Sequence, residues 1–573
     1  MKKLKVIGLV LFLIGFGLFN SLFFIHQYSI QQVDTSKYLN PLQDSLFHHF
    51  ADDFSQEIYP TGFAFSNKLS DLFDKINGAQ LNLYGLTKDE INHITQLHQE
   101  SLTFELNALE KVFDLSESGQ FKFNAFKDYG GWLDGRKFSN PEELQASVEN
   151  VAENIKMYGI INQKGIDRYK KKELLYTLTK QSSFGWAIDH NGLMGILSIG
   201  LSLLGAFIFV FIPDKKQLQV YKSSISSRGW MGILTGTYLI FFYIILYYFP
   251  HYMTGWVILA DPVSMFIKGS EAGPFFLYGL LYTLSILVMG IRMLLKYPTN
   301  RYQQIRTISV MFFQTTFAFL IPEILIRLNK PYFDFKNIWP LDYDFFFDSQ
   351  LNELISHGNL GIFMLGWGIF LILLGVPILV YFFGKRWYCS WVCGCGGLAE
   401  TLGDPFRQLS DKSLSAWKLE RVAIYAVLVF SVIMTIGVIY TYWTGESSFL
   451  GINTYSLRET YGLWIGAAFA GVIGTGFYPL MGNRVWCRYG CPLAAYLGII
   501  QRFKSRFRIT TNGGQCISCG NCSTYCEMGI DVRWYAQRSQ PIVRASCVGC
   551  GICSSVCPRG VLKLENKEEK TRY

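Results

Sequence analysis

The sequence predicts a mainly α-helical, polytopic membrane protein with about eight spans, joined to a mostly helical soluble domain and a small C-terminal α+β domain. Three observations lead to this prediction. Half of the 573 residues are hydrophobic and only 17% are charged, against about 25% charged residues in an ordinary soluble domain. Apolar runs long enough to cross a bilayer recur along the chain. All 13 cysteines lie between Cys389 and Cys557.

The chain begins with Met-Lys-Lys-Leu-Lys and a long apolar run, and residues 1–26 are therefore predicted to form a transmembrane helix. No small-x-small site follows the run, so we interpret it as an uncleaved signal anchor. Residues 27–190 are polar, of mixed charge and free of cysteine, and such a length suffices for one helical domain outside the membrane. That stretch contains neither a C-x-x-C-H haem motif nor a glycine-rich phosphate loop, so no function is assigned to it.

Residues 191–500 carry the remaining predicted spans. Apolar runs of spanning length cover roughly residues 192–212, 229–249, 273–295, 307–327, 359–384, 421–442 and 461–481. Basic side chains gather in alternate loops, beginning with Lys215, Lys216, Lys222 and Arg228. The positive-inside rule then predicts that both termini and every cysteine are cytoplasmic and that residues 27–190 are extracytoplasmic, in a bacterial cytoplasmic (inner) membrane. The same loops account for the formal charge of +9, and no nucleic-acid partner is predicted.

The last stretch, residues 501–573, contains two cysteine runs with the spacing C-x2-C-x2-C-x3-C. Three cysteines in a tight loop hold three corners of a 4Fe–4S cluster, and in two-cluster domains the fourth cysteine of each run binds the other cluster. This rule assigns Cys516, Cys519, Cys522 and Cys557 to cluster 1, and Cys547, Cys550, Cys553 and Cys526 to cluster 2. Residues 501–573 are thus predicted to form a cytoplasmic, two-cluster ferredoxin-like domain.

Two details qualify this motif. Glu527 follows the first run where the pattern prefers proline, whereas Pro558 follows the second run as expected. Structural zinc is the alternative, because zinc sites also use C-x2-C pairs. Two complete quartets in this repeat are more typical of iron–sulfur clusters than of zinc.

Further cysteines lie where predicted helices meet the cytoplasm: Cys389, Cys393, Cys395, Cys487 and Cys491. On a helix, the spacing of four residues within the pairs 389/393 and 487/491 would place both thiols on one face. Such a set could hold an additional metal centre, form a redox disulfide, or consist of packed small residues.

At these motifs the sequence resembles the NosR/NapH-type membrane polyferredoxins, over roughly residues 359–573. Cys487, Cys491 and Pro492 match the C-x3-C-P motif of that family, but Gly394 replaces the proline after Cys393 and Cys395 is extra. The resemblance implies electron exchange between the quinol pool and periplasmic reductases, or maturation of those reductases. The flavin-attachment motif of NosR is not found in residues 27–190, so FMN is not predicted.

Four polar residues near the outer ends of the predicted spans form a candidate quinone or proton site: His190, His251, Glu323 and His357. An ionisable residue inside a span is a functional candidate by default. The alternative is that the histidines are ordinary interfacial residues and that Glu323 pairs with Arg327.

The sequence therefore predicts a membrane-bound iron–sulfur electron-transfer protein that relays electrons between quinone or quinol and other redox protein subunits, in contact with membrane lipid. No substrate-converting site is visible, so the chain is interpreted as an electron-transfer subunit rather than as a stand-alone enzyme. An alternative is an assembly factor for a respiratory metalloenzyme, similar to the cytochrome oxidase accessory proteins. A redox sensor is a third reading, but no transmitter domain follows Cys557.

Overall fold

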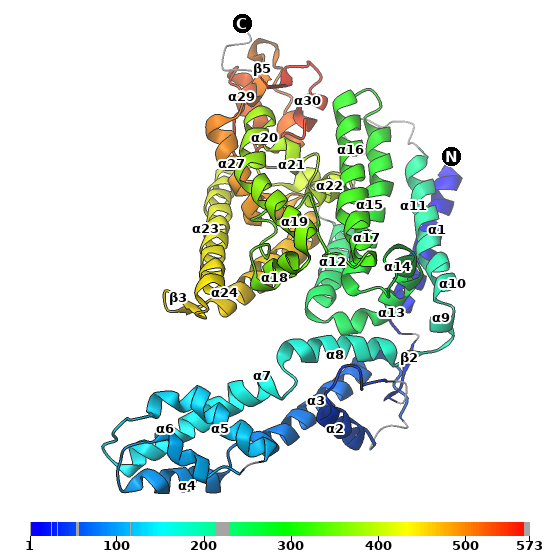
Figure 1. Cartoon of the computed structure of the whole chain (residues 1–573). Coiled ribbons are helices and arrows are strands. Elements are labelled where there is room, and N and C mark those ends of the chain that lie inside the picture. The colour runs from blue at the N-terminus through cyan, green and yellow to red at the C-terminus, as the bar shows by residue number, and fades with distance from the viewer. Residues whose placement is uncertain are drawn as a thin grey trace. The chain divides into compact units, whose positions relative to one another are not determined.

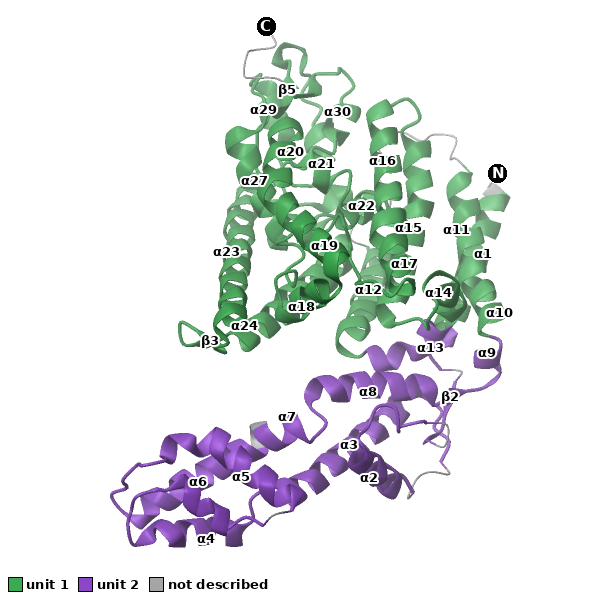
Figure 2. Ribbon diagram, viewed as in Figure 1, with its two compact units in different colours: residues 1–20, 191–249, 259–573 green, residues 21–190, 250–258 purple. Residues whose placement is uncertain are grey.

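The structure is a computed structural model, and it describes residues 2–24, 26–30, 33–52, 57–114, 116–212 and 229–566. The basic loop with Lys215, Lys216, Lys222 and Arg228 lies outside the described residues. The chain divides into two compact units (Figure 2). The polar unit comprises Ser21–His190 and Pro250–Ile258, and the membrane unit comprises Met1–Asn20, Asn191–Phe249 and Leu259–Tyr573. The four domains expected from the sequence stay predictions.

The polar unit is helical and has two hydrophobic cores, one around Phe65 and Phe73 and one around Phe104 and Phe126. Its main helices are α2 (Pro41–Ala51), α3 (Gly62–Tyr84), α4 (Lys88–Gln99), α5 (Glu117–Gly130), α6 (Pro141–Asn154), α7 (Ile161–Gln163), α8 (Arg168–Gln181) and α9 (Trp186–Asp189). Short elements complete it: β1 (Gln27–Tyr28), η3 (Leu106–Lys111), η4 (Gly131–Leu133), η5 (Ile155–Ile160), β2 (Ser183–Phe184), η8 (Pro250–Met253) and α13 (Thr254–Val257), and η9 (Ile258–Ala260) leads into the membrane unit. The strands β1 and β2 pair antiparallel.

The membrane unit contains seven described helices that are long and apolar enough to cross a bilayer (Figure 1). They are α1 (Lys2–Ser21), α10–η6–α11 (Asn191–Gly195, Ile196–Gly200, Leu201–Phe211), α12 (Trp230–Tyr248), α15 (Pro274–Lys296), α16–η10–α17 (Arg301–Phe313, Gln314–Leu320, Ile321–Arg327), α19–η11–α20 (Gly358–Phe370, Leu371–Gly375, Val376–Phe383) and α23 (Leu414–Thr444). These helices coincide with the first seven predicted spans. The mainly α-helical polytopic fold is therefore confirmed.

The eighth predicted span, 461–481, differs from the others. The chain is helical from α24 (Thr454–Tyr461) through η13 (Gly462–Ile473) to α25 (Gly474–Gly476), and a separate short helix, α26 (Tyr478–Met481), follows. The first turns contain charged residues, among them Arg458, which pairs with Asp348 at 2.5 Å. Several glycines follow, and this stretch is therefore less apolar than the seven helices named above and is not among them. In Figure 1, α24 lies at the end of α23 that is farthest from α27, and this helical stretch returns the chain toward the cysteines.

Short elements at the cysteine end of the membrane unit connect the spans to the C-terminal region. They are α21 (Arg386–Cys389), α22 (Gly394–Glu400), η12 (Asp404–Leu409), η14 (Trp486–Gly490) and α27 (Pro492–Lys504). Four other short elements lie elsewhere in the unit: α14 (Asp261–Ile267), α18 (Asp348–Ser356), β3 (Ser448–Phe449) and β4 (Ile452–Asn453). The C-terminal region contains β5 (Phe507–Thr511), η15 (Gly513–Gln515), α28 (Asn521–Thr524), α29 (Val532–Gln537), α30 (Ile552–Ser555) and β6 (Leu562–Asn566). Strands β5 and β6 pair antiparallel, from Phe507 opposite Asn566 to Thr511 opposite Leu562.

Candidate iron–sulfur centres

The outer site is a cavity lined by the four cysteines that the motif assigns to cluster 1: Cys516, Cys519, Cys522 and Cys557. Cys519 is exposed, whereas Cys522 is buried at the start of α28. Gly520 caps α28 with φ 79°, a left-handed conformation that favours glycine. This sharp turn brings the cysteines on both sides of it to the same cavity.

The inner site is a second cavity of the same design, lined by Cys526, Cys547, Cys550 and Cys553. Gly551 caps α30 with φ 74°, as Gly520 does in the outer site. Each cavity is thus lined by three cysteines of one run and the fourth cysteine of the other run, which is the donor set that a 4Fe–4S cluster requires. Among the described residues, no three Cys, His, Asp or Glu side chains converge as a single metal ion requires.

The inner site lies against the helices of the membrane unit. Four hydrogen bonds of 2.8 Å connect residues 547–550 with those helices: Gln303 Nε2 to Cys550 O, Tyr302 OH to Gly549 O, Ser390 Oγ to Val548 O, and Gln501 Nε2 to Cys547 O. Asn300 Nδ2 also donates to Ser555 Oγ at 2.7 Å. The inner site is therefore held against the spans, while Cys519 of the outer site reaches the protein surface.

The membrane-edge site is a third cavity, lined by Cys389, Cys393, Cys395, Cys487 and Cys491. The two pairs do not lie on single helical faces, because the chain leaves the helix between the two cysteines of each pair. Cys389 ends α21 and Cys393 is the N-cap of α22, while Cys487 lies in η14 and Cys491 is the N-cap of α27. A hydrogen bond with Cys395 lowers the pKa of the Cys393 thiol to about 6, and burial raises the pKa of Cys389 to about 12. Cys393 is thus the more readily ionised of these two thiols.

A buried charge network links the membrane-edge site with the inner site. It consists of Lys296, Arg306, Glu400, Asp404, Arg407, Arg484 and Glu527. The Glu527 carboxylate, directly after Cys526, accepts from Arg407 Nη1 at 2.7 Å and pairs with Arg484 Nη2 at 3.0 Å. Arg484 Nη1 lies 3.8 Å from Cys487 Sγ. A continuous path of contacts therefore runs from an inner-site ligand candidate to the membrane-edge cysteines.

Sequence reasoning noted Glu527 only as a departure from the pattern and did not identify the network. The sequence did contain one indication of such a network: an acidic residue stands where the motif prefers proline, directly after a cysteine, in a chain that is basic overall. Burial alone would raise the pKa of Glu527, but Arg407 and Arg484 outweigh that effect and lower it to about 2. Glu527 is therefore an anion inside the protein, held by the two arginines.

The four residues of the predicted quinone or proton site are divided between the two units. In the polar unit, His190 is exposed and its Nδ1 lies 3.0 Å from Trp186 O, whereas His251 is buried, and burial together with Lys172 lowers its pKa to about 4. In the membrane unit, Glu323 is buried in α17, and the half-buried His357 precedes α19, with Nδ1 2.8 Å from Glu353 O. Arg327 donates to Phe266 O. This site stays a prediction.

Comparisons with known proteins agree with the cysteine geometry. A family model described as a 4Fe-4S binding domain matches twice, at residues 365–413 and 462–510, and these ranges contain the membrane-edge cysteines. A model described as a 4Fe-4S dicluster domain matches residues 487–562, which contain the inner and outer sites. The matches confirm iron–sulfur binding regions in the C-terminal part of the chain.

Several curated proteins are similar over the same part of the chain. The methylamine utilization ferredoxin-type protein MauN of Methylobacillus flagellatus is 26% identical, over 26% of this chain and 50% of its own length. The putative electron transport protein YccM of Escherichia coli is 27% identical, over 28% of this chain and 47% of its own length. Protein NirI of Paracoccus denitrificans is 26% identical, over 31% of this chain and 26% of its own length. The match to MauN and YccM thus spans about half of each relative, and no solved structure matches.

Together, the family models, these relatives and the spanning helices confirm the resemblance to membrane polyferredoxins. They support an electron-transfer role for this chain.

Proposed function

We propose that this protein relays electrons between the membrane quinone pool and another redox protein through its iron–sulfur centres. The observation that carries the proposal is the order of the cysteine cavities. The membrane-edge site lies where the spans end, the inner site is hydrogen-bonded to the spanning segment that begins with α16, and the outer site includes the exposed Cys519. This order leads from the membrane to a surface that a soluble or peripheral partner can reach.

The membrane-edge site is the proposed third redox centre of the relay. Five cysteines line its cavity, so four can bind a 4Fe–4S cluster and one remains. The description of the family model that covers these residues, a 4Fe-4S binding domain, supports a cluster over a simple disulfide. When bound, such clusters supply one-electron transfer, so two clusters can together accept the two electrons that a quinol loses with its two protons on becoming quinone.

The protein's own residues hold these centres in place and set their charge. Arg484 and Arg407 bring positive charge between the membrane-edge and inner sites, and Glu527 and Glu400 partly offset it. Positive charge near a cluster favours its reduced state, because reduction adds an electron in a poorly solvated place. The network is therefore proposed to tune the two neighbouring centres together.

We further propose the orientation that the positive-inside rule indicates, with the cysteine end of the membrane unit in the cytoplasm. In support, the start of α1, the connection between α15 and α16, and the C-terminal strands lie at the same end of that unit (Figure 1). The partner would then be a cytoplasmic or membrane-associated redox subunit.

The proposal is tested by anaerobic purification in detergent, iron and sulfide determination, and EPR of the protein after addition of dithionite or of decylubiquinol. About twelve irons per chain are expected with three clusters, and about eight with two. Cluster signals that appear on addition of quinol support the relay. Clusters that neither accept electrons from quinol nor donate electrons to quinone contradict it, and copper bound by the membrane-edge cysteines would favour the assembly role.

A further inference from the structure

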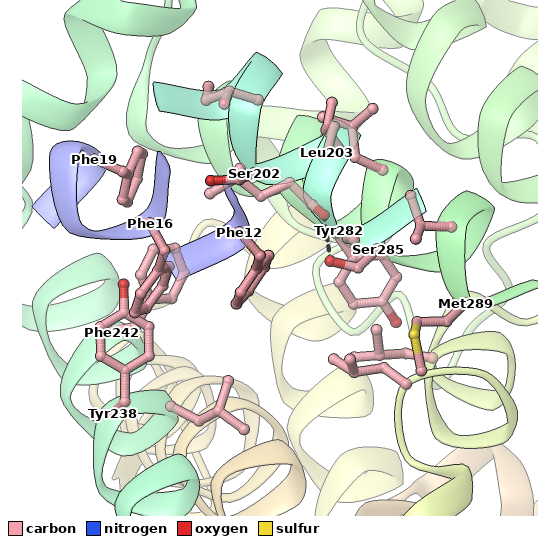
Figure 3. Close-up of a pocket in the computed structure, with 18 of the residues that line it drawn as sticks. Phe12, Phe16, Phe19, Ser202, Leu203, Tyr238, Phe242, Tyr282, Ser285 and Met289 are labelled. Atoms are coloured by element: carbon pink, nitrogen blue, oxygen red, sulfur yellow. Dashed lines mark hydrogen bonds between the residues drawn. The ribbon is translucent and has the colours of Figure 1, made fainter. Parts of the chain in front are cut away.

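A cavity of about 490 Å³ lies between spanning helices of the membrane unit (Figure 3). Its walls come from α1, α11, α12 and α15, with Leu398 and Leu402 at one end. Figure 3 shows Phe12, Phe16 and Phe19 of α1, Tyr238 and Phe242 of α12, and Tyr282, Ser285 and Met289 of α15 around it. The volume lies within the range of about 300–1,000 Å³ that is usual for small-molecule sites.

The lining is aromatic and aliphatic, with a small number of hydroxyl groups. Tyr243, Tyr278, Tyr282 and Thr475 belong to the lining, and the Tyr243 and Tyr278 hydroxyls lie 3.5 Å apart. An apolar cavity with a few polar groups suits a ligand that has an isoprenoid tail and a ring with two oxygens. Sugars, nucleotides and inorganic anions would find no charged partner among these lining residues.

The cavity is open toward the face that lipid covers. Leu9 and Phe209, which line it, are each 44% exposed. A ligand dissolved in the bilayer can therefore reach the cavity on the side of Leu9 and Phe209 without crossing water.

The other end of the cavity reaches the membrane-edge site. Leu398 lies on α22, the helix that Cys393 caps and that contains Cys395. A Cβ placed on Gly394, between these two cysteines, would lie 3.7 Å from Cε1 of Tyr282 and 2.6 Å from Oε1 of Gln314. Tyr282 therefore lies at van der Waals distance from the cysteine loop, and Gln314 approaches Gly394 more closely than a residue with a Cβ would allow without a shift of the glutamine side chain.

From this geometry we propose that the cavity is the quinone-binding site of the protein, with the ring near Tyr282 and the tail toward Leu9 and Phe209. This inference rests on the proposed relay and places its membrane substrate next to Cys393 and Cys395. It differs from the site predicted from the sequence, because none of His190, His251, Glu323 and His357 lines this cavity.

Two variants test the site. Ala206 lines the cavity from α11, so Ala206→Trp would place an indole ring inside it and narrow it. Ala423 of α23 is also half-buried but does not line the cavity, and Ala423→Trp is the matched control. Tyr282→Phe keeps the volume and removes one hydroxyl.

The measurement is calorimetric titration of the purified full chain in detergent with decylubiquinone and, separately, with menadione. It is accompanied by extraction of co-purified quinone and phospholipid, and by thermal unfolding to show that each variant is folded. We expect binding of a quinone by the wild type and by Ala423→Trp, and at least about tenfold weaker binding by Ala206→Trp. We expect about three- to tenfold weaker binding by Tyr282→Phe, since one hydrogen bond contributes about 0.5–1.5 kcal/mol.

Outcomes separate this inference from the proposed function. If the wild type binds quinone and a folded Ala206→Trp binds it equally well, the site lies elsewhere and the inference is wrong, while the relay stands. If the cavity retains only phospholipid and quinone does not displace it, the inference is also wrong. If neither quinone binds to the wild type and quinol does not reduce its clusters, the relay itself fails.

Discussion

At the residue scale, the cysteines were the most predictable part of the molecule. Their spacing alone grouped Cys526 with the second run and Cys557 with the first, and the structure lines its two cavities with these same groups. Spacing could do this because only two or three residues separate neighbouring cysteines in the tight loops. The partners of Glu527 could not be predicted from the sequence, because Arg407 lies 120 residues away along the chain and nothing in the local sequence connects the two residues.

Each cavity contains the fourth cysteine of the other run, and this arrangement predicts the effects of two pairs of variants. Cys557→Ser should abolish the cluster of the outer site and leave that of the inner site, as Cys516→Ser should, because both cysteines line the same cavity. Cys526→Ser and Cys547→Ser should have the opposite effect. EPR of the dithionite-reduced variants checks this, with the loss of about four irons in each. If Cys557→Ser resembles Cys547→Ser instead of Cys516→Ser, the assignment is wrong.

At the scale of elements, hydropathy located the spans because seven of them are uniformly apolar. The eighth predicted span, 461–481, stays a prediction: helix continues through η13 and α25 to Gly476, and the short helix α26 follows the turn at Phe477. The pattern also could not show that α22 starts at Gly394 and packs against Gln314 and Tyr282. Packing between distant helices decides such details, and a single sequence contains no direct record of it.

The start of α22 explains why glycine replaces the family's proline. Proline is favoured in the first turn of a helix, but here a Cβ would lie 2.6 Å from Gln314 Oε1. Gly394→Pro should therefore lower the apparent Tm and the iron content, and Gln314→Ala should restore much of both in the double variant. Pro492, which already follows Cys491, serves as the comparison position. A double variant as unstable as Gly394→Pro would show that Gln314 is not the obstacle.

The element η12 is fixed to α15 by Asp404, and this contact predicts a pH dependence. Burial would raise the pKa of Asp404, but Lys296, Arg407 and Arg292 outweigh it and hold the pKa at about 2. A carboxyl with a lowered pKa stabilises the fold above its unfolded value near 4, and this contribution is lost as the pH falls from about 4 to about 2. At neutral pH it amounts to about 2 kcal/mol.

Asp404→Asn should therefore lower the apparent Tm by the same amount at every pH from 5.5 to 8, because Asp404 stays ionised throughout this range. The difference from wild type should shrink only below about pH 4. Thermal unfolding in detergent, followed by tryptophan fluorescence, checks this. Asp411→Asn, at a largely exposed carboxylate, is the control and should change the Tm little. A difference that grows between pH 8 and 5.5 would contradict the assignment.

At the scale of the whole molecule, composition and loop charge predicted a polytopic protein, and the membrane helices bear this out. Orientation depends on whether the stretch from α24 to α25 crosses the membrane, since seven crossings would place the C-terminal region opposite the start of α1. With eight crossings, a fluorescent protein fused after Tyr573 should fluoresce in cells, and alkaline phosphatase inserted near Lys137 should be active. Fusions with the reverse pattern at position 573 would show that only seven segments cross.

Because each cavity combines cysteines of both runs, the arrangement also determines when each site can be completed during synthesis of the chain. A ribosome releases the membrane-edge cysteines first, and that set is complete at Cys491. The last cysteine of the inner cavity to be synthesised is Cys553, and the last of the outer cavity is Cys557. Both sets of cysteines therefore become complete within four residues of each other. Before Cys553 is made, the first run has supplied three thiols to the outer cavity and one to the inner cavity, and neither cavity is complete. The cell's cluster-insertion machinery therefore meets the two sites of this domain almost simultaneously, after the helices that anchor them have been made.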